Sequence, residues 1–490
     1  MLNKRTLRCF SGLIPATAFF LVVAGTASAA GVSNAASRQA GERQATPKQR
    51  TSPIYATSRQ GAPVVNLTAA DLEVKLAGNP VSDFTLTKGG SKDKLLFLVF
   101  DTASLGSNAL SVSKEIAQST IARAGEGVRF VVMSVDPGAG LKLICGPTTE
   151  REAAGAAISR SIASKFWSHD LDSSGINRVA APDPARIQKE DREIGPIVIG
   201  SLRTLGAVVG RFTESDKVVQ FYSGGIPQGA MVQRSTIPQY IGYTNAWVPE
   251  SFTSPETDTY YRIMSCGQGI KKSGALLFAI NAAGVVTGEA HDISGEPSLR
   301  MLVSESGGRY FEGTQKAVSD SLAEIEEGYY ELGVPLAGEV GDAGVSLEVR
   351  PKSPDITVTS ASTFLKTRSF GKMTPAEKQV TIMALVSHGL AGDIGLKVSK
   401  APVEISGNGE ASQLSVQLPV ELSQAEWDIY KVWRDTSKGT FQIEKEHVLS
   451  ESPLLTFSVA GRKDTIQDAV LVQAQSGTVL VCQGKGKPKS

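Results

Sequence analysis

Asp101 ends an apolar run and is followed at once by small and hydroxyl-bearing residues. The run Leu95–Phe100 contains only apolar side chains, which is typical of a strand buried on both faces of a parallel sheet. Ligand sites of such sheets lie beyond the carboxyl ends of the strands. Asp101, Thr102 and Ser104 are therefore predicted to stand at the edge of the sheet where recognition or chemistry takes place.

Other residues that could recognise a partner follow later strands. Ser223 comes directly after the apolar run Lys217–Tyr222, and Trp247 lies in the aromatic-rich segment Gln239–Tyr261, which we expect to be mostly loop. Exposed Trp and Tyr side chains contribute strongly to protein interfaces. We predict that Ser104, Ser223 and Trp247 contact a partner; the alternative is that the rings of this segment pack back onto the sheet.

A nucleophilic enzyme is the rival interpretation. Ser104, Ser223 and His291 all lie near expected strand ends, and the segment Trp167–Gly195 lacks periodicity and could form a lid. However, no Gly-x-Ser-x-Gly elbow surrounds either serine. No Gly-rich phosphate-binding loop follows a strand, so no nucleotide cofactor is expected. A cell-envelope hydrolase remains the alternative function.

Metal-binding patterns are weak. Asp170–Gly175 has oxygen-bearing side chains at alternate positions, as a calcium loop does, but Ala181 stands where a bidentate acid is needed. The four histidines lack ligand spacing, which argues against zinc.

The N-terminus has the pattern of a secretory signal peptide, with basic residues before the apolar segment Leu13–Val23 and small residues up to Ala29. Cleavage after Ala29 changes the formal net charge from +1 to −2. The mature chain therefore has no overall positive charge that would attract nucleic acid. The apolar segment is too short for a membrane span, and none is expected after cleavage. Cys145, Cys266 and Cys482 remain, which leaves any disulfide pairing open.

Periodicity divides the remaining chain into parts. Residues 30–60 are expected to form a disordered linker, 61–90 a leading β-hairpin module, 91–335 an α/β domain, 336–483 a β-rich C-terminal domain and 484–490 a flexible tail. Within the α/β domain, strands and helices alternate, which favours a doubly wound sheet with helices on both faces. The strands expected there are Leu95–Phe100, Val128–Val135, Leu141–Cys145, Lys217–Tyr222, Ala275–Asn281 and Arg309–Glu312.

The second and third of these strands are close together and predict a hairpin, which gives the sheet one antiparallel edge. The helices expected are residues 109–124, Glu150–Phe166, Gly200–Phe212, Thr257–Ile270, Pro297–Ser306 and Ala317–Glu327. Short strands separated by turn residues predict a β-sandwich in the C-terminal domain, with one helix near Thr374–His388.

Scattered blocks between Pro63 and Val420 resemble, in order, the bacterial secreted von Willebrand factor A-related proteins. The blocks read LTAADLEVKLAGNPV, LLFLVFDTAS, KVVQFYSGGI, ALLFAINAAGV and SESGGRYFEGTQKAVSDSLAEIEEGYYELGV. Each is a generic fragment, and the resemblance rests on their order. It implies a von Willebrand factor A domain in an exported binding protein.

The resemblance also implies a metal held by an Asp-x-Ser-x-Ser loop, a threonine from a second loop and an acid from a third. Asp101 is present, but Ala103 and Leu105 replace the two serines and Gly224 replaces the third-loop acid. Thr148, or its neighbour, could supply the second hydroxyl. Because Mg²⁺ needs about six oxygen ligands, Asp101 and Thr148 are candidate ligands of a degenerate site that we do not expect to hold metal.

The sequence therefore predicts an exported, non-enzymatic protein of adhesion or scaffold type. It would present the strand-end face of a von Willebrand factor A-like domain to a protein or a cell-envelope component, with no cofactor.

Overall fold

The computed structural model describes most of the chain. The described residues are 48–89, 94–162, 184–212, 216–226, 255–282, 295–336, 344–364 and 370–388, and then 397–398, 403–406, 413–418, 424–435, 440–452, 454–458, 466–473 and 478–483. The expected signal peptide and the expected tail lie outside these residues.

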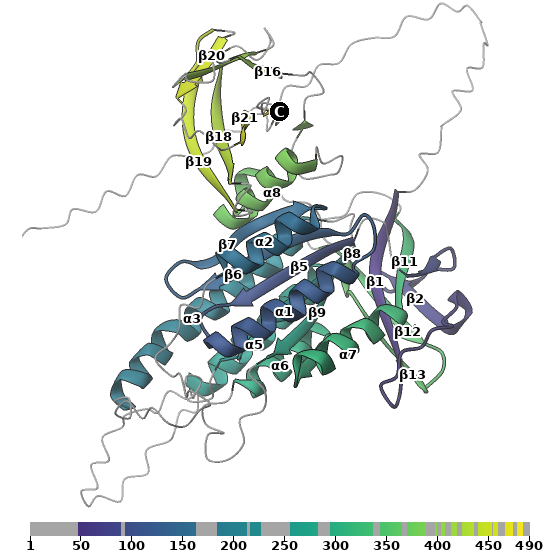
Figure 1. The fold of residues 1–490 in the computed structure, drawn as a ribbon. Coiled ribbons are helices and arrows are strands. Elements are labelled where there is room, and N and C mark those ends of the chain that lie inside the picture. The colour runs from purple at the N-terminus through teal and green to yellow at the C-terminus, as the bar shows by residue number, and fades with distance from the viewer. Residues whose placement is uncertain are drawn as a thin grey trace, which may run out of the picture. The chain divides into compact units, whose positions relative to one another are not determined.

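A six-stranded sheet forms the centre of the α/β domain (Figure 1). Its order is β10-β9-β8-β5-β6-β7, and all neighbours are parallel except β6 and β7. The six predicted strands are confirmed, with β7 longer than expected. Their bounds are β5 Lys94–Asp101, β6 Arg129–Asp136, β7 Gly140–Thr148, β8 Asp216–Tyr222, β9 Ala275–Asn281 and β10 Arg309–Glu312.

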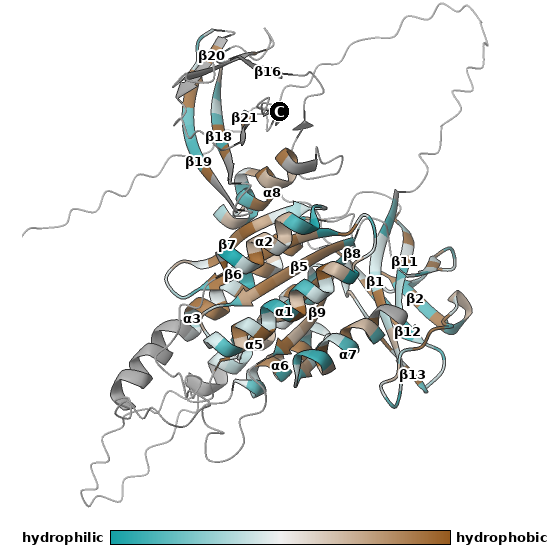
Figure 2. Cartoon of the chain, viewed as in Figure 1, coloured by the Kyte–Doolittle hydropathy of each residue, from teal (hydrophilic) through white to brown (hydrophobic). Residues whose placement is uncertain are grey.

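Helices cover both faces of this sheet. Their bounds are α1 Ser107–Arg123, α2 Arg151–Ser161, α3 Pro184–Val209, α5 Pro255–Lys272, α6 Glu296–Ser306 and α7 Gln315–Glu327. In β5, Leu95, Phe97 and Val99 pack with α3, α5 and α6, whereas the side chains between them pack with α1, α2 and α7. Figure 2 shows the resulting hydrophobic colour along β5 and β6. Each fully buried aliphatic or Phe side chain contributes about 1.5–3 kcal/mol relative to exposure, which explains the continuous apolar run.

The prediction that Trp167–Gly195 lacks regular structure is wrong in its second half. Residues 184–195 belong to α3, which continues to Val209 with Pro196 inside it. This part of the chain is rich in Arg, Gln, Lys and Glu, which favour helix without an apolar stripe. Residues 163–183 lie outside the described residues.

A β-sandwich built from both flanks of the α/β domain replaces the predicted hairpin module and the described end of the predicted linker, whose residues 30–47 lie outside the described residues. One sheet has the order β13-β1-β11-β4 and the other β14-β12-β2-β3. Figure 1 shows purple β1 beside green β11. The bounds are β1 Lys48–Ser58, β2 Leu72–Leu76, β3 Asn79–Pro80, β4 Thr85–Lys88, β11 Tyr329–Leu336, β12 Val345–Pro351, β13 Ile356–Ser360 and β14 Thr363–Phe364; a short 3₁₀ helix, η1, spans Ala69–Asp71.

Three expectations are corrected by this sandwich. Residues 48–58 are a central strand and not linker, β2 and β4 lie in different sheets and form no hairpin with each other, and β12–β14 do not belong to the C-terminal domain. The physical reason is that pairing partners are far apart along the chain, so local patterns cannot reveal them. The two sheets share a core that includes Ile54, Leu72, Tyr330 and Leu347.

The C-terminal strands form one sheet and not the expected sandwich. Its order is β19-β18-β21-β22-β16-β17-β20, with β15 paired to β22. Helix α8 (Pro375–His388) confirms the predicted helix, begins after a Thr374–Glu377 capping box and packs on this sheet. The bounds are η3 Phe370–Lys372, β15 Lys397–Val398, β16 Val403–Ser406, β17 Gln413–Gln417, β18 Ala425–Asp435, β19 Thr440–Ser450, β20 Leu454–Ser458, β21 Ile466–Gln473 and β22 Thr478–Gln483.

Cys145 and Cys266 are free, buried thiols. Burial raises the pKa of Cys145 to about 12 and that of Cys266 to about 11, so both are inert as nucleophiles. The side chain of Cys482 lies outside the described part of the chain. No described helix combines the length and hydropathy that a membrane span requires.

Candidate functional site

The strand order brings Asp101 and Ser223 together. β5 and β8 are neighbours, and β6 lies on the other side of β5. The chain leaves β5 toward β6 and leaves β8 toward β9, so the two connections run in opposite directions from the carboxyl ends of β5 and β8. Open α/β sheets bind ligands at such a point. Phe100 and Tyr222, the residues just before Asp101 and Ser223, stack with ring centroids 4.8 Å apart and hold the two strand ends side by side.

The Asp101 carboxylate accepts four hydrogen bonds. Its Oδ2 accepts from Ser104 Oγ at 2.6 Å and from Ser223 Oγ at 2.7 Å. Its Oδ1 accepts from the backbone nitrogens of Ala103 and Ser104 at 3.2 and 3.3 Å. The two serine oxygens lie 3.0 Å apart. We refer to Asp101, Ser104 and Ser223 as the Asp101 cluster.

Burial dominates the electrostatics of this cluster. Asp101 has no exposed surface. Burial raises the pKa of the Asp101 carboxyl, and the bonds from Ser104, Ser223 and the loop amides counteract part of the rise because they favour the charged form. The carboxylate is thus stabilised by donors from its own loop and from Ser223 at the end of β8.

The serines are satisfied inside the cluster. Ser104 Oγ accepts from the Gly224 nitrogen and Ser223 Oγ from the Gly225 nitrogen, both at 2.9 Å. Ser223 is fully buried, so the prediction that it contacts a partner is wrong. The reason is that a buried carboxylate needs donors, and the nearest hydroxyls turn inward to supply them. Ser104 is only partly buried and remains reachable in part.

Close backbone contact explains why glycine stands where the third-loop acid was expected. A Cβ on Gly224 would lie 2.8 Å from the Ser104 carbonyl oxygen. Gly225 has a φ of +81°, and its Cβ would lie 2.1 Å from the carbonyl oxygen of Gly295, which bridges to it. Ser298 completes the contact by accepting from the Ile226 nitrogen at 2.8 Å. No acid could replace these glycines without displacing the backbone.

Thr148 lies at the opposite end of the sheet from Asp101, which corrects its assignment as a metal ligand. It pairs with Phe130, and Phe130 pairs with Leu96 near the start of β5. Asp101 is five residues further along β5, a rise of about 16 Å. Because β7 returns antiparallel to β6, its last residue necessarily ends at the amino ends of the parallel strands. Thr148 Oγ1 instead accepts from the Glu150 nitrogen at 3.0 Å.

The described residues at this edge do not fit a divalent cation. Both oxygens of Asp101 are taken by protein donors, and Ala103 and Leu105 are fully buried apolar residues. Among the described residues, no three His, Cys, Asp or Glu side chains gather as a metal site would require. A hard cation needs about six oxygen ligands, and this cluster offers three oxygen-bearing side chains already bonded to one another.

Trp247, His291 and the calcium-like loop Asp170–Gly175 lie outside the described residues. The aromatic segment around Trp247 is described only at its end. There, Tyr260 and Tyr261 belong to helix α5, which matches the predicted helix Thr257–Ile270, and Tyr261 is exposed.

A second polar group at the same edge was missed from the sequence. Arg300 donates from Nε to Glu296 at 2.6 Å, approaches Glu312 at 3.4 Å and lies over the ring of Tyr310. The Tyr310 hydroxyl donates to Glu312 at 2.9 Å and accepts from Asn281 at 3.1 Å. Two signals could have revealed it: the four-residue spacing of the Glu–Arg pair on a helix and the two-residue spacing of the Tyr–Glu pair on a strand.

No protein-family model and no curated protein sequence matches the chain. Among solved structures, it is similar to a von Willebrand factor type A protein from Catenulispora acidiphila, with 9% identity over 65% of this chain and 74% of that one and a TM-score of 0.26. It is also similar to manganese-loaded TRAP protein from Plasmodium vivax, with 11% identity, 58% and 97% coverage and a TM-score of 0.27. A mutant of the PilB minor pilin from Streptococcus sanguinis follows, with 12% identity, 57% and 87% coverage and a TM-score of 0.25.

Proposed function

We propose that the chain is an exported, non-enzymatic binding protein. In it, a doubly wound, von Willebrand factor A-like domain presents its strand-end edge to a protein or a cell-envelope component without a metal ion. The observation that supports this proposal is the closed Asp101 cluster, whose acceptors and donors are bonded to one another at the point where a ligand site of this sheet would lie. Recognition then comes from the surface around the cluster.

The described surface of this edge suits a polar protein partner. Ser107 and Asn108 are exposed in the first turn of α1, directly after the Asp101 loop. The charged group of Glu296, Arg300 and Glu312 lies at the ends of β9 and β10 along the same edge. Charged and hydroxyl side chains at an interface rim favour specificity and association rate.

The hydrolase alternative has less support. Both serines of the cluster bond directly to Asp101, with no imidazole between them and the acid. His447, in β19 of the C-terminal sheet, bonds to Asp428 at 3.0 Å and is not part of the cluster. A serine nucleophile needs a general base within hydrogen-bond reach, and the described residues supply none other than a buried carboxylate.

Capture from envelope extract, with paired variants, tests the proposal. Ser107→Glu with Asn108→Glu adds two charges at the strand-end edge, where acids suit a helix start. Ala122→Glu with Gly125→Glu adds the same charge at the far end of α1, near Arg151. We expect the edge variant to lose about tenfold of the captured partner, about 1.4 kcal/mol, and the control to retain it.

The same capture is repeated with Mg²⁺ and with a chelator, and the yield should not change. Loss of the partner in chelator would contradict the metal-free mechanism. Equal capture by both variants would contradict the assignment of the binding edge.

A further inference from the structure

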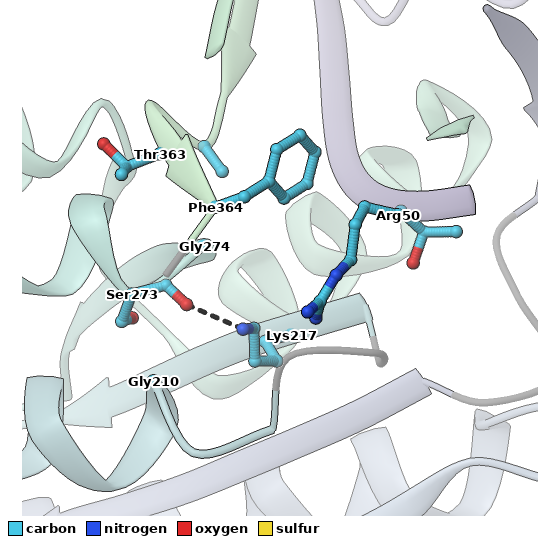
Figure 3. A pocket seen from close by; sticks show the side chains of 9 residues that line it. Arg50, Gly210, Lys217, Ser273, Gly274, Thr363 and Phe364 are labelled. Carbon is cyan, nitrogen blue, oxygen red and sulfur yellow. Dashed lines mark hydrogen bonds between the residues drawn. The ribbon is translucent and has the colours of Figure 1, made fainter. Parts of the chain in front are cut away.

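A small cavity lies where the β-sandwich meets the opposite end of the central sheet. β1 and β14 of the sandwich form one side; β8 and the turn between α5 and β9 form the other (Figure 3). It has room for a single water-sized ligand. The lining residues are Arg50, Thr51, Gly210, Lys217, Ser273, Gly274, Ala361, Thr363 and Phe364.

Two buried cations line this cavity. Figure 3 shows Arg50 reaching from β1 toward the Lys217 amine. Arg50 is 7% exposed and Lys217 is 5% exposed. Lys217 Nζ donates one hydrogen bond, to the Ser273 carbonyl oxygen at 2.6 Å. An ammonium group has three hydrogens, so further donor capacity remains at the cavity.

The cavity is rich in donors. The Thr51 hydroxyl is buried and has no hydrogen-bond partner among the described residues. Gly274, with a φ of +82°, keeps the space open, because a Cβ there would lie 3.2 Å from Lys217 Nζ. A buried donor without a partner is costly, and a ligand that accepts hydrogen bonds would remove that cost.

The charges favour an anion over water. Two charged side chains act on Lys217: Asp216, which raises its pKa, and Arg50, which lowers it. Burial is the largest effect and brings the Lys217 pKa down to about 7. With Lys217 protonated, the three groups carry one net positive charge, and one monovalent anion neutralises it.

We propose that the cavity between Arg50 and Lys217 binds a small monovalent anion of the size of chloride, and that this anion fastens the β-sandwich to the α/β domain. Arg50 and Thr51 come from the sandwich and Lys217 from the central sheet, so one ion contacts both parts. Binding to the folded state alone raises the stability of this junction.

Thermal unfolding of the full chain tests the proposal in sodium chloride and in sodium gluconate of equal ionic strength, at about pH 6, where Lys217 is charged. Gluconate is too large for the cavity. The midpoint of the wild type should be higher in chloride by about 1–2 °C when chloride is a few times above its dissociation constant. The difference should shrink at about pH 8, because Lys217 then loses its proton.

Variants locate the effect. Lys217→Met should lose the chloride increment, and Lys316→Met, which removes an exposed lysine of α7, should keep it. Thr51→Val, a change of nearly equal volume, serves if the buried lysine variant does not fold, and should reduce the increment. A bromide-soaked crystal should show an anomalous peak between Arg50 and Lys217. Equal midpoints in the two salts for the wild type, an increment that survives in Thr51→Val and Lys217→Met, or a cavity without bromide would each overturn the proposal.

Discussion

A buried carboxylate that accepts hydrogen bonds from two different segments holds these segments together. Asp101 ties the start of α1, through Ser104, to the end of β8, through Ser223. Each bond to a charged group contributes about 1.5–3 kcal/mol, offset by the desolvation of the acid. The cluster therefore fixes the geometry of the edge, while its net contribution to stability is modest.

Replacement of the Asp101 carboxylate should show how much the fold depends on the Asp101 cluster. Asp101→Ala leaves two hydroxyls and two backbone amides without their partner and should lower the free energy of unfolding by about 2–4 kcal/mol. Asp101→Asn keeps the shape and should cost less. Urea unfolding measures both, with Asp355→Asn, an exposed site, as a control that changes by less than about 0.5 kcal/mol.

The pH dependence of the same comparison has a definite sign. The folded-state pKa of Asp101 is raised above its usual 3.8, so the folded chain holds a proton that the unfolded chain has released. The wild type should therefore gain stability relative to Asp101→Asn as the pH falls through the folded pKa toward 3.8, and lose it as the pH rises. A constant difference across that range would contradict the assignment.

At the scale of elements, β1 and β5 show what makes a strand essential. β5 has seven consecutive buried residues and two parallel neighbours. β1 is equally central in its own sheet, between β11 and β13, yet its sequence is mostly polar. Its inward side chains Ile54 and Ala56 enter the sandwich core, and Tyr55 points the other way, into the cluster of the α/β domain.

Truncation of Ile54 should show that β1 is structural. Ile54 is fully buried, so Ile54→Ala should lower the free energy of unfolding by about 2–5 kcal/mol through lost burial and the remaining cavity. Val65→Ala, at a 36% exposed position, should change it by less than about 0.5 kcal/mol. Denaturant unfolding measures the free energy of unfolding of both variants. Equal, small changes would contradict the structural role of β1.

The sequence of β5 is apolar between its two end residues and that of β1 is mostly polar, which explains why the first strand could be predicted and the second could not. Continuous apolarity identified β5 and its neighbours, and alternation of strands and helices identified the α/β domain. Ser104 and Ser223 were placed at the correct edge, but their inward orientation depends on the buried acid between them. Thr148 lies at the other end of the sheet, because β7 runs antiparallel to β6 and its last residue pairs with Phe130 near the start of β6. The pairing of β1 with β11 was invisible, because it joins residues that are far apart in the chain, such as Lys48 and Leu336.

At the scale of the whole molecule, the α/β domain is an insertion in the sandwich. Strands β1–β4 precede it, and β11–β14 follow it. Neither set alone forms a complete sandwich: β2 pairs with β12 and β4 with β11. Folding of the sandwich therefore requires closure of a long loop, whose entropy cost grows only slowly with length.

Removal of β12–β14, which include the strand that pairs with β2, should leave the sandwich core uncovered. The full chain with residues 344–364 replaced by a Gly-Ser linker should expose Leu72 and Val74, bind more of a hydrophobic dye than the wild type and melt at a lower temperature. Calorimetry and dye fluorescence compare the two chains. Identical melting would contradict the two-segment sandwich.

The β1–β11 ladder also decides how the chain would carry a mechanical load. Lys48 pairs with Leu336 at one end of the ladder and Tyr55 with Tyr329 at the other. Tension applied directly at Lys48 and Leu336 would load this end of the ladder first and open it one pair at a time. Until the last pair opens, the inserted domain and its Asp101 cluster are shielded from the force.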